Sequence, residues 1–180
     1  AALGEALRAQ PPSSLLTIAR GSSDHAAHYM AYLVMARLGR LVTSLPMSLI
    51  TLYHSQIESR GLVSLAFSQS GQSPDLVSPT RYFREAGART VAFVNAAGSP
   101  LADAAEHVFA LHAGPEQSVA ATKSYIAQLL AGARVVAAWQ GDEDLAAALQ
   151  QLPQAMERAA ALRWDAAVDA LVGADKLFVI

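Results

Sequence analysis

Residues 62–75 read LVSLAFSQSGQSPD, which combines an apolar run, a serine-rich turn and a helix start. The run 62–67 has the length and unbroken apolar character of a strand that is buried on both faces. Ser73, Pro74 and Asp75 then form a helix start, because Ser is a good N-cap, Pro fits the first helical position and Asp favours the first turn. This stretch predicts a strand that passes through a tight turn directly into a helix.

The same alternation continues on both sides of that stretch. Four more apolar runs have the length of strands, at residues 15–19, 41–45, 90–94 and 107–111. Helices are expected at residues 26–38, 73–87, 118–139 and 145–172, with shorter ones beginning near residues 46 and 98. Strands that alternate with helices over this length predict an α/β fold with a parallel sheet covered on both faces.

Composition excludes several classes of function. The chain has 180 residues, of which 53% are hydrophobic, enough for one substantial core. The net charge is −2 and no basic run occurs, so no nucleic-acid partner is expected. There are no cysteines, and the five histidines form no metal-binding motif, so we expect a cytoplasmic protein without a metal or other cofactor. The longest apolar stretch, 125–139, is too short and too polar to cross a membrane.

Two serine-rich turns are the candidate binding elements. Residues 21–25 read GSSDH and residues 68–74 read SQSGQSP, and each lies between a predicted strand and a predicted helix. A helix start can hold an anion through its unpaired N–H groups and dipole, and serine hydroxyls can donate to the same oxygens. Neither turn contains a Lys or Arg, so no cation is expected near the cradle. The alternative is that each serine only caps its helix, but two such turns in one chain favour a phosphate site.

Two other anion or acyl sites are excluded by the same residues. No G-x-x-x-x-G-K-[ST] motif occurs, so the turns are not a nucleotide P-loop. Ser70 is flanked by Ser68 and Gln72 where a nucleophile elbow needs glycines, so a hydrolase is not indicated.

Three motifs in order resemble a known family. GSSDHA at 21–26, FSQSGQSPD at 67–75 and AGPEQSVAATK at 113–123 are similar to the sugar isomerase (SIS) domain. The resemblance covers about residues 15–139 and is closest to the first of two such domains in the isomerase part of glucosamine-fructose-6-phosphate aminotransferase, and to shorter two-domain relatives. It implies a three-layer αβα sandwich around a five-stranded, flavodoxin-like parallel sheet. Ligands of such sheets bind where the strand order reverses, here beyond strands one and three.

The resemblance also implies roles for individual residues. Ser68, Gln69, Ser70 and Ser73 would hold the phosphate of a hexose phosphate, with Gly71 permitting the tight turn, while Gly21, Ser22 and Ser23 would contact the sugar or close the cradle. Val119 would contribute backbone contacts to the sugar, and Ala121 stands where the aminotransferases usually carry Ser. Lys123 would neutralise the ligand or Glu116; the alternative is a surface ion pair near a helix start.

The resemblance further divides the chain. Residues 1–10 are expected to end an N-terminal helix, 11–145 to form the SIS domain, 146–172 to form a helical linker and 173–180 to begin a second SIS domain. The segment 176–180, KLFVI, reads as a buried strand. The alternative is that this strand pairs within the first domain.

The implied function is that of a phosphosugar-binding domain. Family enzymes open the sugar ring, move a proton between neighbouring carbons, and add or remove ammonia. Their carboxylate base and ring-opening histidine lie in the second domain or across a subunit interface, so the catalytic residues are expected outside this chain. We therefore expect part of an isomerase, deaminase or aminotransferase-like enzyme for glucosamine 6-phosphate or fructose 6-phosphate type substrates, acting as a homodimer. The alternatives are a regulatory phosphosugar sensor and a purely structural domain.

Overall fold

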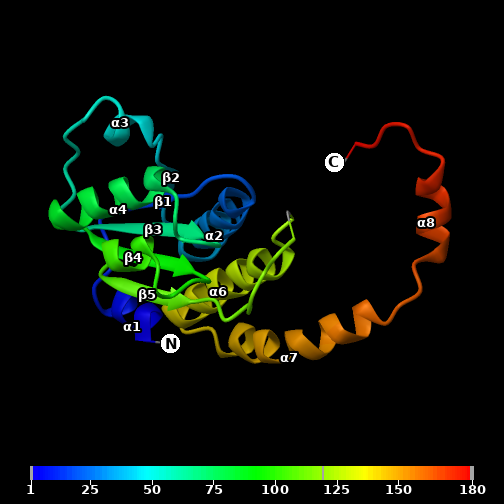
Figure 1. Cartoon of the computed structure of the whole chain (residues 1–180). Coiled ribbons are helices and arrows are strands. Elements are labelled where there is room, and N and C mark those ends of the chain that lie inside the picture. Colours follow the sequence, from blue (N-terminus) through cyan, green and yellow to red (C-terminus); the bar gives the residue numbers. More distant parts are fainter. Residues whose placement is uncertain (1, 119, 179–180) are drawn as a thin grey trace.

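Five parallel strands form one sheet, and α7 (Glu143–Ala160) and α8 (Asp165–Val172) extend away from it (Figure 1). The computed structural model describes residues 2–118 and 120–178. The strands are β1 (Ser14–Ile18), β2 (Val42–Ser44), β3 (Leu62–Ser68), β4 (Arg89–Val94) and β5 (His107–Ala110). Their order across the sheet is β2-β1-β3-β4-β5, so the predicted flavodoxin-like arrangement is confirmed.

The central strand β3 is buried over its whole length, as its apolar sequence predicts. It pairs with β1 on one side, where Ile18 lies opposite Ala66, and with β4 on the other, where Phe67 lies opposite Phe93. The rings of these two phenylalanines stack with their centroids 4.5 Å apart. The strand that carries the second serine turn is therefore held firmly on both edges.

Helices cover both faces of the sheet, which confirms the three-layer sandwich. One face is covered by α1 (Ala2–Ala9), α2 (Ser22–Leu38) and α6 (Thr122–Gln140), and the other by α3 (Ser48–Thr51), α4 (Pro74–Glu85) and α5 (Pro100–Ala104). Alternate side chains of β3 divide between these layers, because successive residues of a strand point to opposite faces. Val63, Leu65 and Phe67 pack in the first core, and Leu62 and Ala66 in the second.

Helices α2 and α6 pack closely against each other (Figure 1). A Cβ atom placed on Gly132 of α6 would lie 3.1 Å from the Cβ of Met30 on α2, so the missing side chain lets the helices approach. Helix α2 follows β1 and α6 follows β5. Their amino-terminal ends therefore lie toward the carboxyl edge of the sheet.

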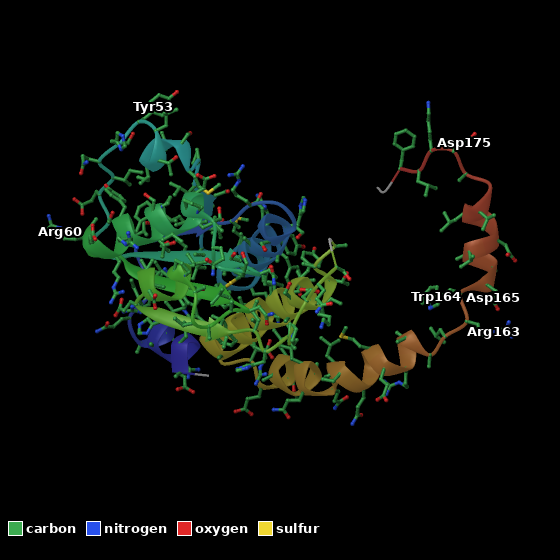
Figure 2. The ribbon with its side chains drawn as sticks, viewed as in Figure 1. Tyr53, Arg60, Arg163, Trp164, Asp165 and Asp175 are labelled. Atoms are coloured by element: carbon green, nitrogen blue, oxygen red, sulfur yellow. The ribbon has the colours of Figure 1, made fainter. Side chains whose placement is uncertain are left out.

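The carboxyl-terminal part of the chain differs from the prediction. Instead of one helical stretch over 145–172 there are two helices, α7 (Glu143–Ala160) and α8 (Asp165–Val172), separated by residues 161–164. The side chain of Trp164 in this break is 58% exposed, and Figure 2 shows it at the start of α8, well apart from the sandwich.

The predicted strand at the carboxyl end is wrong for the residues that the structure describes. Residues 176–178 have no regular structure, and Phe178 is 89% exposed. A strand is stable only when it pairs with another, and these residues do not join the five-stranded sheet. Residues 179–180 lie outside the described residues. Within the described ranges, 2–118 and 120–178, no helix is long and apolar enough to cross a bilayer.

Candidate functional site

The two serine turns leave adjacent strands at the same edge of the sheet. Since Ile18 of β1 lies opposite Ala66 of β3, the chain enters both turns within a few residues of that pair. Helix α2 then crosses to one face of the sheet and α4 to the other, which makes this edge the point where the strand order reverses. The two turns therefore lie at the edge of the sheet where the sequence predicted that a ligand binds.

Arg20 corrects the expectation that no cation lies near the cradle. It directly precedes the first turn, and its guanidinium pairs with the carboxylate of Asp75 in the first turn of α4. This ion pair spans the two serine turns. The prediction considered only residues within the two turns, and Arg20 lies just outside GSSDH in the sequence.

The second turn is held by its own hydroxyls. Ser68 is buried, and its Oγ accepts a hydrogen bond of 2.9 Å from the Gly71 N–H, while the Oγ of Ser70 accepts a longer one of 3.3 Å from the Gln72 N–H. A serine oxygen that accepts in this way still has its own proton to donate. Both hydroxyls can therefore serve a bound anion without breaking the turn.

Capping does not account for these serines. Ser73 does occupy the N-cap position of α4, as predicted, but its side chain makes no capping hydrogen bond. At α2 the N-cap is Gly21, with φ 59° and ψ −140°, a conformation that is readily adopted only by glycine. Ser22 and Ser23 thus fall inside the first helical turn, with Ser22 exposed and Ser23 half-buried.

Asn95 links the second turn to a third segment. It follows β4 directly, and its N–H donates to the carbonyl of Gln69 at 3.2 Å. Its side-chain oxygen accepts from the Ala113 N–H at 2.8 Å, and its amide nitrogen donates to the Gly114 carbonyl at 2.9 Å. The sequence reading missed this residue, although an amide directly after a buried apolar run is a recognisable signal.

Glu116 explains why α6 begins at Thr122 and not at residue 118. Its carboxylate accepts from the backbone N–H groups of Lys123 at 2.7 Å and Ser124 at 3.2 Å, and from the Ser124 hydroxyl at 2.5 Å. The carboxylate thus accepts hydrogen bonds from backbone N–H groups in the first turn of α6, which have no partner within the helix, although Glu116 itself lies before the helix. The hydrogen bond from the Ser124 hydroxyl is the largest cause that lowers the pKa of Glu116 below its ordinary value.

The side chain of Lys123 fixes the same loop. Its ammonium donates to the carbonyl of Pro115 at 2.6 Å. In the part of the chain that the structure describes, Lys123 therefore contacts the Glu116 carboxylate through its backbone N–H. The surface ion pair, which was the alternative to the predicted role of Lys123, is not formed within these described residues. Val119, predicted to contact the sugar, lies outside the described residues.

Replacing Glu116 by Gln is expected to lower the thermal unfolding midpoint at pH 7. A carboxyl group with a lowered folded pKa stabilises the fold above its unfolded pKa, near 4.5, and loses that contribution as the pH falls through the folded value. The difference between wild type and Glu116→Gln should therefore shrink on acidification. Thermal unfolding from pH 7 down to about pH 3 measures this. A difference that stays constant with pH, or an equal effect of the exposed control Glu157→Gln, would contradict this role.

Gln128 connects α6 to the first serine turn. Its side-chain nitrogen donates to the Ser23 hydroxyl oxygen at 3.0 Å, although Gln128 itself is fully buried. The sequence analysis assigned no role to this residue. Three segments are thus brought together: the two serine turns and the start of α6.

A separate cavity lies at the amino-terminal edge of the sheet. It has a volume of about 550 Å³ and is lined by residues that include Pro12, Gly61, Arg84 and Arg89. Arg84 donates to the carbonyls of Asp103 and Ala105, both at 3.0 Å, and Arg89 donates to Gln10. Arg84 is thus engaged, whereas the Nη1 of Arg89 is buried without a hydrogen-bond partner among the residues that the structure describes. Because parallel sheets bind ligands at the opposite, carboxyl edge, we place the site at the serine turns. Within residues 2–118 and 120–178, no group of three or more His, Cys, Asp or Glu side chains could hold a metal ion.

Comparison with known proteins agrees with this architecture. Residues 10–138 match the SIS domain family. An isomerizing glutamine–fructose-6-phosphate aminotransferase of Thermus thermophilus is 36% identical over 149 residues, which are 83% of this chain and 24% of that protein. The chain therefore spans about a quarter of the length of this relative.

Solved structures show the same fold. A protein of Silicibacter pomeroyi DSS-3 named "putative phosphosugar isomerase" superposes with a TM-score of 0.90 at 40% identity, over 94% of this chain and 52% of that one. The C-terminal domain of glucosamine-fructose-6-phosphate aminotransferase from Francisella tularensis superposes with a TM-score of 0.70 at 23% identity, over 83% of this chain and 44% of that one. Since the family match covers most of its length, the chain belongs to the SIS domain family.

Proposed function

We propose that the carboxyl edge of β1 and β3 binds the phosphate of a sugar phosphate. The observation that carries this proposal is that the hydroxyls of Ser68 and Ser70 accept from the backbone of their own turn and keep their protons for a ligand. Ser73 adds a hydroxyl that is not used for capping α4. A phosphate oxygen accepts such bonds well, because hydrogen bonds to a charged acceptor are stronger than neutral ones.

The sugar is proposed to extend from the phosphate toward the first turn and the start of α6. Gly21, Ser22 and Ser23 supply one wall, and the loop that leads to Lys123 supplies the other. Gln69 is fixed through its carbonyl by Asn95, which leaves its side-chain amide as a further donor. The proposed ligands are glucosamine 6-phosphate, fructose 6-phosphate and related amino-sugar phosphates.

We further propose that this chain supplies the binding part of a larger isomerase, deaminase or aminotransferase-like enzyme. Two of the carboxylates near the site are already engaged, Asp75 with Arg20 and Glu116 with the start of α6. Neither is free to act as the base, which supports catalytic residues in a second SIS domain, begun by residues 173–180, or in a partner subunit of a homodimer. A cytoplasmic enzyme fits this proposal. The same observation supports a second candidate, a regulatory module that senses phosphosugars without catalysis.

Calorimetric titration of the 180-residue chain tests the binding proposal. Glucosamine 6-phosphate and fructose 6-phosphate are expected to bind, whereas unphosphorylated glucosamine is not. Equal binding of glucosamine and its 6-phosphate would overturn the phosphate assignment, as would the absence of binding to any of the three. A turnover assay on the same protein then tests the proposed missing base, because full activity would show that the catalytic base lies within these residues.

A further inference from the structure

We infer that Gln128 is a positioning residue that turns the Ser23 hydroxyl into a hydrogen-bond donor toward the bound phosphosugar. This inference rests on the proposed function and assigns a role to a residue outside all three family motifs. Gln128 lies on α6, 105 residues from Ser23 in the sequence, and reaches it through the interior of the protein. It is 0% exposed and therefore does not contact a ligand from solvent.

The hydrogen-bonding capacity of the Ser23 hydroxyl provides the first argument. A serine oxygen has one proton and two lone pairs. The amide nitrogen of Gln128 donates to one lone pair of Ser23 at 3.0 Å, and the proton of Ser23 then has to point away from Gln128. Ser23 is half-buried at the start of α2, directly after the exposed Gly21 and Ser22. Its proton is then left for another acceptor, and we assign that role to the anionic ligand.

The oxygen atom of the Gln128 amide provides the second argument. The Oε1 atom of Gln128 is buried without a hydrogen-bond partner among the described residues. A buried acceptor left unpaired destabilises a fold, so an apolar residue would suit this position better if packing were its only task. In the structure the amide nitrogen, and not this oxygen, faces Ser23.

The packing of α6 on α2 provides the third argument, which concerns how rigidly Ser23 is held. Gly132 lies one turn after Gln128, and its lack of a side chain allows α6 to approach Met30 of α2 closely. The spacing between the two helices is therefore fixed next to the hydrogen bond. Gln128 can hold the hydroxyl of Ser23 in one orientation before a ligand arrives, so that binding does not have to order it.

A double-mutant cycle tests this inference by calorimetry with glucosamine 6-phosphate. Ser23→Ala should weaken binding roughly tenfold or more, the effect of one hydrogen bond to a charged acceptor. Gln128→Met keeps the length of the side chain and frees the Ser23 hydroxyl to rotate, so a smaller loss, of roughly three- to tenfold, is expected. Gln128→Glu should weaken binding more than Gln128→Met, because a carboxylate accepts the Ser23 proton and withdraws it from the ligand. The exposed control Gln151→Met, on α7, should bind like wild type.

The decisive result is the effect of Gln128→Met in the Ser23→Ala background. If Gln128 acts through Ser23, this second change has no further effect on affinity. If the two losses simply multiply, Gln128 has a general structural role and the inference is wrong. Wild-type affinity in both Gln128 variants would also overturn it while leaving the phosphosugar site intact. Failure of the wild-type protein to bind overturns the proposed function and this inference together.

Discussion

Gly71→Ala is expected to lower the free energy of unfolding by about 2–5 kcal/mol and to abolish phosphosugar binding. Gly71 has a φ of +65°, which costs energy for any residue with a Cβ. A Cβ there would also lie 2.1 Å from the Oγ and 2.6 Å from the Cβ of Ser99, and 2.9 Å from Val94. These neighbours belong to the end of β4 and the start of α5, so relief of the contact would displace the whole turn.

Urea unfolding of three alanine variants separates the two causes. Gly98→Ala should change stability little, because Gly98 has neither a positive φ nor any atom within 4 Å of the added Cβ. Gly87 has a φ of +86° and open space around it, so Gly87→Ala should cost only the conformational part, about 1 kcal/mol. A Gly71→Ala variant no less stable than Gly87→Ala would show that the turn accommodates the extra atom, and would contradict the close packing on Ser99.

Ser70→Ala is expected to weaken the binding of glucosamine 6-phosphate roughly tenfold to hundredfold while the fold stays intact. The Ser70 hydroxyl accepts only a long bond, 3.3 Å, from the Gln72 N–H, so its loss should hardly affect stability. Its donated bond to a phosphate oxygen is a hydrogen bond to a charged group and accounts for the expected loss. Calorimetry gives the affinity, and circular dichroism with urea unfolding gives the state of the fold.

The matched control is Ser78→Ala, which removes an exposed serine hydroxyl from α4 at a distance from the proposed cradle. It should bind like wild type. Unchanged affinity in Ser70→Ala would remove Ser70 from the phosphate site. Equal weakening in both variants would show that the effect arises from α4 and not from the hydroxyl.

The strands and most helices could be predicted because their signals are local. An apolar run such as 62–67 needs only its own residues to indicate a buried strand, and Ser73–Pro74–Asp75 marks a helix start within one turn. The order of the strands came from the resemblance. The break at residues 161–164 carries no Gly or Pro, so nothing in the local sequence separated α7 from α8.

The parts of the site that were missed depend on residues far apart in the chain. Arg20 meets Asp75 across 55 residues, and Gln128 meets Ser23 across 105. The Glu116 carboxylate accepts from backbone N–H groups seven and eight residues further along the chain, whereas the two residues of a capping box are three apart. Such partners are set by how the strands and helices are arranged in space, and no periodicity or local motif encodes them.

The Arg20–Asp75 pair has a consequence for the conditions under which the site can operate. Because the guanidinium is already paired with a carboxylate, Arg20 adds little net positive field for an approaching phosphate. Attraction over distances beyond the Debye length, about 8 Å at physiological ionic strength, is then weak, and recognition depends on short hydrogen bonds at contact. Occupancy of the site should therefore follow the concentration and shape of the sugar phosphate and respond little to changes in cellular salt. Polyanions, which bind by releasing counterions from clusters of cations, gain no such advantage here.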